Sequence, residues 1–166
     1  MKEQHVCCRR LTKKDGALYY QLLMRGYGVN KKYGVDFSAS HSTEKEAIQW
    51  IDENPTLGLF VDNVLVSSAS LRMPWGAHPG PTPYPHVGHV VTDARWQGRG
   101  YARQIMRHIE SWARDILCAP VVTLGTADTH PWLVDMYKSF GYEPFAERKL
   151  EGKAHTTIYL QKKLYE

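Results

Sequence analysis

A glycine-rich turn that begins at Gln97 carries the residues best suited to bind an anion. Two glycines, Gly98 and Gly100, flank Arg99 directly before a helix-like segment. Glycine lets a ligand approach the bare backbone, and the first N–H groups of a helix have no partner within it. The partial positive charge of a helix start, aided by Arg99 and Arg103, favours phosphate or pyrophosphate. A plain strand-to-helix turn, whose glycines serve only its geometry, is the alternative that this turn leaves open.

Two familiar phosphate-binding loops do not match this turn. The dinucleotide fingerprint needs a third glycine where Arg103 stands, and it lies near the start of a strand–helix–strand unit. A P-loop needs Gly-Lys followed by Ser or Thr, and the chain has no such triplet. The turn therefore indicates a different class of anion site.

Histidines and one tyrosine are the other side chains that could move protons. His86 and His89 lie on the strand-like run before the turn, and histidine titrates near neutral pH. Three residues apart on a strand, they are predicted to point to opposite faces, so they do not form a metal site with His78. Tyr137, on a later helix-like segment, is either a core aromatic or a proton donor. Serine hydrolase chemistry is excluded because no Gly-x-Ser-x-Gly elbow occurs.

Periodic segments around these residues predict the elements that position them. Apolar residues recur at helical spacing from Ala102 to Ile116, which predicts an amphipathic helix after the turn. Thr43 and Glu46 have capping-box spacing, which predicts the start of another helix. The predicted strands are 6–11, 57–61, 64–71, 87–92, 121–125, 144–149 and 156–160. The predicted helices are 12–24, 43–54, 102–116 and 131–140. Residues 26–41 are predicted to be a loop or irregular helix, and residues 73–85, rich in proline, a long loop.

Length and composition restrict the class of protein. The chain has 166 residues, of which 43% are hydrophobic and 23% charged, as in one soluble globular domain. No apolar run approaches the ~20 residues of a membrane span, and no secretory signal is recognisable. The three cysteines are expected to be reduced thiols in a cytoplasmic protein. The net charge of +4 suits an anionic ligand rather than nucleic acid.

Two motifs now resemble a known family, the GNAT N-acetyltransferases. Residues 97–102 match its Gln/Arg-x-x-Gly-x-Gly/Ala signature, and Tyr137 to Tyr142 match its Tyr-x-x-x-Gly-aromatic helix end. The resemblance implies one N-acetyltransferase domain over 1–166 with an α+β fold: a mostly antiparallel mixed sheet of six to seven strands with helices on both faces. It also implies acetyl-CoA as co-substrate, no metal, and direct transfer of the acetyl group to a primary amine in a ternary complex. A catalytically silent acyl-CoA-binding sensor or partner-binding module is the alternative.

The resemblance also implies roles for individual residues. Tyr137 matches the general acid that protonates the leaving thiolate, and His86 falls near the family's general base, with His89, a water-mediated base or no base as alternatives. In this family the strand before the turn splays from the strand at 121–125, and the pantetheine arm lies in the gap. His130 replaces an asparagine that often contacts CoA. The residues implied to bind acetyl-CoA are Val90, Val91, Thr92, Gln97, Gly98, Arg99, Gly100, Tyr101, Ala102, Arg103 and His130.

The proline-rich loop is predicted to contact the acceptor. It contains no acidic residue to attract a polycation, whereas Trp75 and Tyr84 offer flat amphipathic surfaces. These features favour a small or peptide-like amine with an apolar or aromatic part. The alternative is that the loop packs in the interface of a homodimer.

Overall fold

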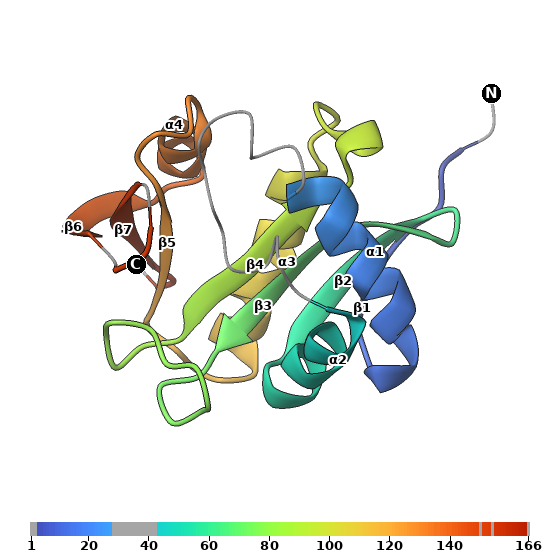
Figure 1. The fold of residues 1–166 in the computed structure, drawn as a ribbon, viewed down its shortest axis with the longest axis horizontal. Helices are drawn as coiled ribbons and strands as arrows, with labels where there is room; N and C mark the ends of the chain where they lie inside the picture. Colours follow the sequence, from blue (N-terminus) through green and yellow to red (C-terminus); the bar gives the residue numbers. More distant parts are fainter. Residues whose placement is uncertain (1–2, 28–42, 150, 154, 166) are drawn as a thin grey trace.

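Seven strands form a single sheet in the computed structural model, which describes residues 3–27, 43–149, 151–153 and 155–165 (Figure 1). Their order in the sheet is β1-β2-β3-β4-β5-β7-β6. All neighbours are antiparallel except β4 and β5, which run parallel. The strands are β1 (Val6–Arg10), β2 (Thr56–Val61), β3 (Val64–Arg72), β4 (His86–Thr92), β5 (Val121–Ala127), β6 (Glu143–Lys149) and β7 (Thr156–Lys163). The predicted fold class and element order are confirmed.

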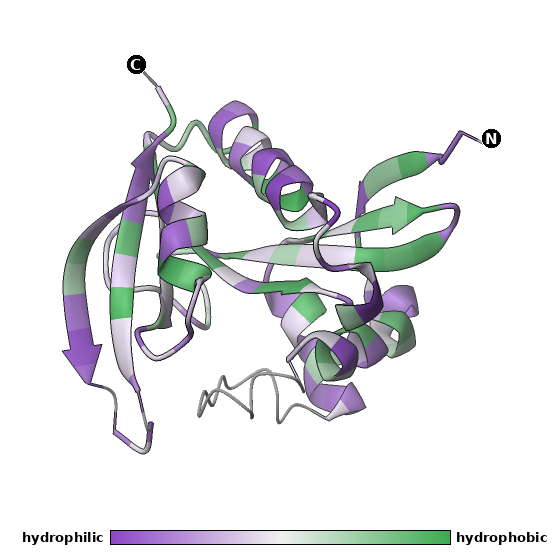
Figure 2. Cartoon of the chain, turned by 90° about the horizontal axis from the view of Figure 1, so that it is seen from above, coloured by the Kyte–Doolittle hydropathy of each residue, from purple (hydrophilic) through white to green (hydrophobic). Residues whose placement is uncertain are grey.

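Helices cover both faces of the sheet. Helices α1 (Gly16–Tyr27) and α2 (Glu44–Glu53) lie on one face, and α3 (Tyr101–Asp115) lies on the other (Figures 1 and 2). The short α4 (Leu133–Ser139) lies beside β5. Each face therefore needs its own apolar layer between helix and sheet.

Two hydrophobic clusters fill these layers. The larger one joins the buried side of α3 to the strands and includes Ile105, Met106 and Ile109. The smaller one joins α1 and α2 to the opposite face and includes Tyr19 and Leu23. Burial of these side chains fixes which way the helices face, because apolar area removed from water stabilises the fold by about 25 cal/mol per Å².

Local signals place several element ends. The Thr43 hydroxyl accepts a hydrogen bond from the Glu46 N–H at 3.2 Å, so the predicted cap of α2 is confirmed. Asp62 and Asn63 adopt positive φ angles of 48° and 68°, the conformation that a two-residue hairpin between β2 and β3 requires. Gly141 follows α4 with φ 99°, as expected for a glycine after a helix end.

The ends of three helices differ from the prediction. Helix α4 begins at Leu133 rather than at residue 131, because Trp132 is its N-cap. Helix α1 begins at Gly16 after a 3-10 turn over Lys13–Asp15, and it extends through Gly26 to Tyr27 instead of ending at residue 24. Residues 28–42, most of the predicted loop, lie outside the described residues. Helix α3 ends at Asp115, one residue before the predicted end, and Ile116, which the periodicity placed on the apolar face, is 63% exposed. None of the helices in the described ranges has the length and apolar character that a membrane span requires.

Candidate active site

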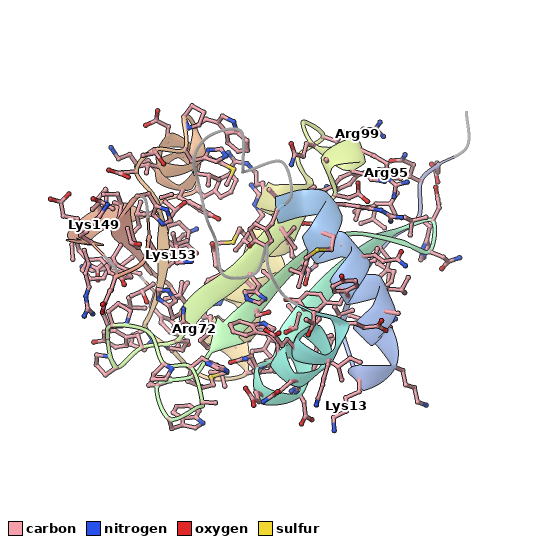
Figure 3. The ribbon with its side chains drawn as sticks, viewed as in Figure 1. Lys13, Arg72, Arg95, Arg99, Lys149 and Lys153 are labelled. Atoms are coloured by element: carbon pink, nitrogen blue, oxygen red, sulfur yellow. The ribbon has the colours of Figure 1, made fainter. Side chains whose placement is uncertain are left out.

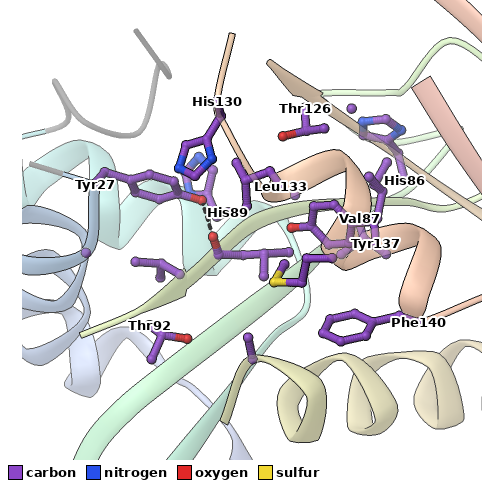
Figure 4. Close-up of a pocket in the computed structure, with 18 of the residues that line it drawn as sticks. Tyr27, His86, Val87, His89, Thr92, Thr126, His130, Leu133, Tyr137 and Phe140 are labelled. Atoms are coloured by element: carbon purple, nitrogen blue, oxygen red, sulfur yellow. Dashed lines mark hydrogen bonds between the residues drawn. The ribbon is translucent and has the colours of Figure 1, made fainter. Parts of the chain in front are cut away.

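A cleft opens where β4 and β5 separate. The two strands pair only through His86 with Thr123 and Val87 with Leu124. A cavity of about 1180 Å³ extends from this point between the two halves of the sheet (Figure 4). Gly88 and Gly125, the next residues along the two strands, both line it. The predicted splay of these strands is therefore present.

One end of the cavity is formed by the glycine-rich turn. Asp93, only 1% exposed, accepts hydrogen bonds from the backbone N–H and the guanidinium of Arg95, at 2.9–3.1 Å. These bonds with Arg95 hold the pKa of Asp93 below its usual range, so the carboxylate stays charged. They also fix the 3-10 helix Ala94–Trp96 that leads into the turn.

The turn leaves its backbone open toward the cavity. Gly98 and Gly100 adopt positive φ angles of 79° and 82°, and a Cβ on either would meet no described atom within 4 Å. Gly100 is the N-cap of α3 and supplies no side-chain cap, so the first N–H groups of the helix face the ligand space. Arg103 also lines the cavity, stacked over the Phe140 ring at 4.7 Å. These groups fit a pyrophosphate.

Most residues predicted to bind acetyl-CoA come together along this cavity. The ones that line it are Val90, Val91, Thr92, Gln97, Gly98, Gly100, Tyr101, Ala102, Arg103 and His130. Arg99 is not among the lining residues, and its guanidinium lies over the Trp96 ring at 5.0 Å. His130 is 5% exposed, and its ring meets Trp132 edge to face.

A β-bulge interrupts β4 in the middle of the cleft. The register to β3 shifts so that His89 and Val90 together oppose a single residue, and His89 has φ 48°. Side chains from the helices hold the bulge: the Tyr27 hydroxyl donates to the Val90 carbonyl at 2.6 Å, and the His89 ring stacks on Trp50 at 3.6 Å (Figure 4). Tyr19 bonds the Nδ1 of His89 at 2.8 Å.

The bulge overturns the predicted alternation of the two histidines. Gly88 shares the face of His86, two residues away, and a Cβ on Gly88 would meet the Trp50 ring at 3.6 Å. His89 stacks on that same ring, so both histidines lie on the α1–α2 side of the sheet. The extra residue of a bulge shifts every following side chain to the other face, and strict alternation cannot predict this.

Tyr137 lies in the cavity wall opposite β4 (Figure 4). Its ring is 6% exposed and packs edge to face on Phe140 and Tyr142. Burial raises the pKa of its phenol above the ordinary value of 10.0, so the hydroxyl keeps its proton. The residue is thus a core aromatic that also lines the cavity with a protonated hydroxyl.

His86 lies near the point where the strands separate. Its Nδ1 is 2.8 Å from the Thr123 hydroxyl, and its ring meets Tyr159 edge to face. Burial, together with the positive charge of Arg72, lowers the pKa of His86 to about 3. The imidazole is therefore neutral at physiological pH.

The other end of the cavity differs from the predicted acceptor site. Trp75 is 77% exposed, and neither it nor Tyr84 is among the lining residues. The aromatic residues that line this end are Trp50 and Tyr159, together with Arg72 from the end of β3. Sequence offered one signal for Arg72, a charged residue that ends an otherwise apolar and small-residue strand. Trp50 carried no signal beyond its place on a helix.

Comparison with known proteins identifies the family. The acetyltransferase (GNAT) family profile matches residues 19–142, about three-quarters of the chain. The chain belongs to the GNAT acetyltransferase family. It is 35% identical over 157 residues to S-(2-succino)cysteine N-acetyltransferase of Bacillus subtilis, with 94% of each chain covered. It is 30% identical over 146 residues to S-alkylcysteine N-acetyltransferase of the same organism, covering 87% of this chain and 82% of the relative.

Solved GNAT structures share the fold. The yncA acetyltransferase of Salmonella typhimurium, solved with acetyl-CoA, superposes with a TM-score of 0.77 at 17% identity, over 98% of this chain and 95% of the other. The ribosomal-protein-S18-alanine N-acetyltransferase of Escherichia coli gives a TM-score of 0.75 at 12% identity, over 98% and 96%. The GNAT chain described here is an acetyl-CoA-dependent N-acetyltransferase, as its motifs predicted, rather than a silent binding module. Among the described residues, no group of three His, Cys, Asp or Glu side chains is placed to hold a metal ion.

Proposed function

We propose that this enzyme acetylates the α-amine of S-substituted cysteines, by direct transfer from acetyl-CoA in a ternary complex. The observation that carries this proposal is the 35% identity, over 94% of both chains, to an enzyme named for S-(2-succino)cysteine. A second relative is named for S-alkylcysteine, so the two share a cysteine amine and differ in the group on sulfur. This acceptor also agrees with the small amine bearing an apolar part that the sequence predicted.

We propose that both substrates occupy the cavity at once. We assign the pyrophosphate of acetyl-CoA to the turn around Gly98 and Gly100, with Arg103 beside it. The pantetheine arm then follows β4 from Thr92 toward the bulge, which brings the thioester near Val90. The acceptor enters from the opposite end, past Trp50 and Tyr159. Holding the amine against the thioester in this way removes most of the entropic cost of their encounter.

Two groups of the protein assist the transfer. A backbone N–H at the bulge donates to the thioester oxygen as negative charge develops there, an effect typically worth about 3–4 kcal/mol. As the C–N bond forms and the C–S bond breaks, the Tyr137 hydroxyl gives its proton to the departing thiolate of CoA, and the proton that the attacking nitrogen loses restores the phenol through solvent in the cleft. Burial keeps this phenol protonated, as the role requires.

His86 is a weaker candidate for the base than its position in the sequence indicated. The neutral His86 imidazole, whose conjugate acid has a pKa of about 3, is too weak a base to take a proton from an ammonium group at neutral pH. We propose instead that His86 positions the floor of the cleft through Thr123, and that the acceptor enters with its amine already neutral.

Turnover on defined acceptors tests this function. The protein is incubated with acetyl-CoA and S-(2-succino)cysteine, S-methylcysteine, spermidine or an alanine-terminated peptide, and free CoA is followed with a thiol reagent. We expect turnover on the two cysteine derivatives only, with the mass of one acetyl group added at nitrogen. Preference for spermidine or the peptide would contradict the proposed acceptor while leaving the N-acetyltransferase activity in place.

A further inference from the structure

Arg72 is a cation at the proposed acceptor end of the cleft, and no carboxylate of the described residues balances its charge. It is partly buried at the end of β3, where Figure 3 labels it, and it lines the cavity. No carboxylate of the described residues lies within ion-pair distance of its guanidinium. Burial lowers its pKa, which shows that its surroundings disfavour the charge. A desolvated charge without a counter-ion is costly, so this position suits an anionic ligand.

One edge of the guanidinium is already fixed. Nε donates to the His78 carbonyl at 2.6 Å, and Nη2 donates to the Pro79 carbonyl at 3.0 Å. Arginine has five N–H donors, so three remain, including both on Nη1. The proline-rich loop thus orients a fork that can grip a carboxylate through two parallel hydrogen bonds.

The acidic residues nearby are occupied elsewhere. Glu53 accepts from Gln49 at 2.7 Å through one oxygen and pairs with Nε2 of His78 at 2.7 Å through the other. Glu46, the other acidic residue that lines the cavity, accepts from the Thr43 hydroxyl at the start of α2. His86 and His89 are neutral, since burial and the charge of Arg72 lower the pKa of each to about 3.

Arg72 also lies next to the part of β4 that leads into the bulge. In the sheet it pairs with His86, and a Cβ on Gly88 would lie 3.0 Å from its Cδ. Gly88 directly precedes the bulge, where the thioester is expected. In a free amino acid the amine and the carboxylate share one carbon atom. An acceptor whose amine reaches the bulge therefore brings its carboxylate toward Arg72.

We propose that Arg72 binds the α-carboxylate of the acceptor in a two-pronged ion pair and thereby selects free amino acids over amines that lack this group. This assignment rests on the proposed function, because it specifies how the same site recognises a cysteine derivative. In this assignment one arginine both anchors the proline-rich loop and recognises the acceptor.

A pair of acceptors that differ only in the carboxylate tests the assignment. The value of kcat/KM is measured for S-benzylcysteine and for S-benzylcysteamine with three proteins: the wild type, Arg72→Met and Arg72→Lys. We expect the wild type to prefer S-benzylcysteine, and Arg72→Met to lower kcat/KM for it by about 100-fold while changing that for S-benzylcysteamine by less than about 3-fold. Arg72→Lys, which keeps the charge but not the fork, is expected to fall between them, and the KM for acetyl-CoA is expected to stay the same in all three.

Two controls separate recognition from loop anchoring. His78→Ala removes the ion pair with Glu53 but keeps the guanidinium, so it is expected to affect both acceptors by the same factor. Arg114→Lys, at the far end of α3, is expected to leave kcat/KM for both acceptors unchanged. If Arg72→Met lowers kcat/KM for both acceptors by the same factor, or if the wild type has the same kcat/KM for both, the Arg72 assignment is overturned while cysteine acetylation stands. If the wild type acetylates neither S-benzylcysteine nor S-(2-succino)cysteine, the proposed function fails and the assignment falls with it.

Discussion

The chemistry of the cleft depends on side chains whose protonation is set by burial. Tyr137 stays a neutral phenol because its ring is enclosed by Phe140 and Tyr142, and an ionised phenolate would lose its hydration there. His86 stays a neutral imidazole for the same reason, strengthened by the charge of Arg72. Among the described residues the site thus combines a protonated phenol with a neutral imidazole, as the proposed entry of the acceptor as a free amine requires.

Removing the Tyr137 hydroxyl tests its role as general acid. Tyr137→Phe keeps the ring and its packing, and we expect kcat to fall about 100-fold with acetyl-CoA affinity unchanged. Steady-state kinetics together with isothermal titration of acetyl-CoA measures both quantities. Tyr165→Phe removes a hydroxyl that bonds the Arg114 carbonyl outside the cleft, and it should retain full kcat. Full activity in Tyr137→Phe would make the residue a core aromatic only.

At the scale of elements, the glycine-rich turn and the clamped bulge serve different parts of the proposed acetyl-CoA site: the turn the pyrophosphate, the bulge the thioester. The turn offers open N–H groups because Gly98 and Gly100 adopt left-handed backbone conformations and carry no side chain. The bulge holds His89 in a strained conformation that costs on the order of 1–3 kcal/mol, offset by contacts from Tyr27 and Trp50. Helices α1 and α2 therefore shape the backbone at which the acetyl group is expected.

A substitution in the turn tests the proposed pyrophosphate site. Acetyl-CoA is expected to stabilise the folded protein by about 2.7 kcal/mol at 100 times its Kd, measured as a rise in Tm. Gly100→Asp is expected to abolish this rise, because it places a negative charge where the phosphates bind. Gly100→Ala carries the same backbone strain without the charge, so it should lower the Tm of the free protein yet keep part of the rise. An unchanged rise in Gly100→Asp would place acetyl-CoA elsewhere.

A substitution in α1 tests the clamp on the bulge. Tyr27→Phe removes the hydrogen bond to the Val90 carbonyl, and we expect kcat to fall about 10-fold as the bulge loses its preferred orientation. The rise in Tm with acetyl-CoA should persist, because the turn is untouched. Tyr20→Phe, on the same helix, is the matched control and should keep wild-type kcat. Equal kcat values for the two variants would show that the bulge needs no support from Tyr27.

At the scale of the molecule, the cleft divides the sheet into two parts joined by only two residue pairs. Separate hydrophobic clusters support the two faces, and buried His86 and half-buried His89 line the cleft from β4. His86 and His89 bind protons in the unfolded chain near pH 6.5 but in the folded protein only near pH 3. Acid therefore favours the unfolded state of the whole molecule.

Stability against pH measures this effect. As the pH falls from 6.5 toward 3, each histidine is expected to lower the free energy of unfolding by up to about 1.4 kcal/mol per pH unit; above 6.5 neither contributes. Urea unfolding between pH 7.5 and pH 5 gives the slope, in a range above the usual pKa of the aspartates. His86→Asn should flatten the slope, whereas His108→Asn, exposed on α3, should not. Parallel profiles for His86→Asn and the wild type would contradict the prediction.

The order of the elements and the place of the glycine-rich turn could be predicted because both depend on local rules. Apolar spacing predicted α3, and the capping pair of Thr43 and Glu46 predicted α2, since a helix start is decided within one turn. Glycines that must adopt positive φ angles mark the turn at residues 97–102 within a single stretch of chain. The family motifs are contiguous in the same way, so the sequence alone indicated a GNAT acetyltransferase.

The proposed acceptor end of the cleft could be recognised only in the tertiary structure, because its residues come from separate elements. Arg72, Trp50 and Tyr27 meet at the cleft from β3, α2 and α1, and no spacing in the sequence links them. The bulge at His89 brought two histidines to one face, against the alternation of a regular strand. Trp75 instead faces solvent, although its type and its loop favoured a contact with the acceptor. Which side chains meet, and which of them burial keeps neutral, depends on contacts between distant segments that local patterns do not contain.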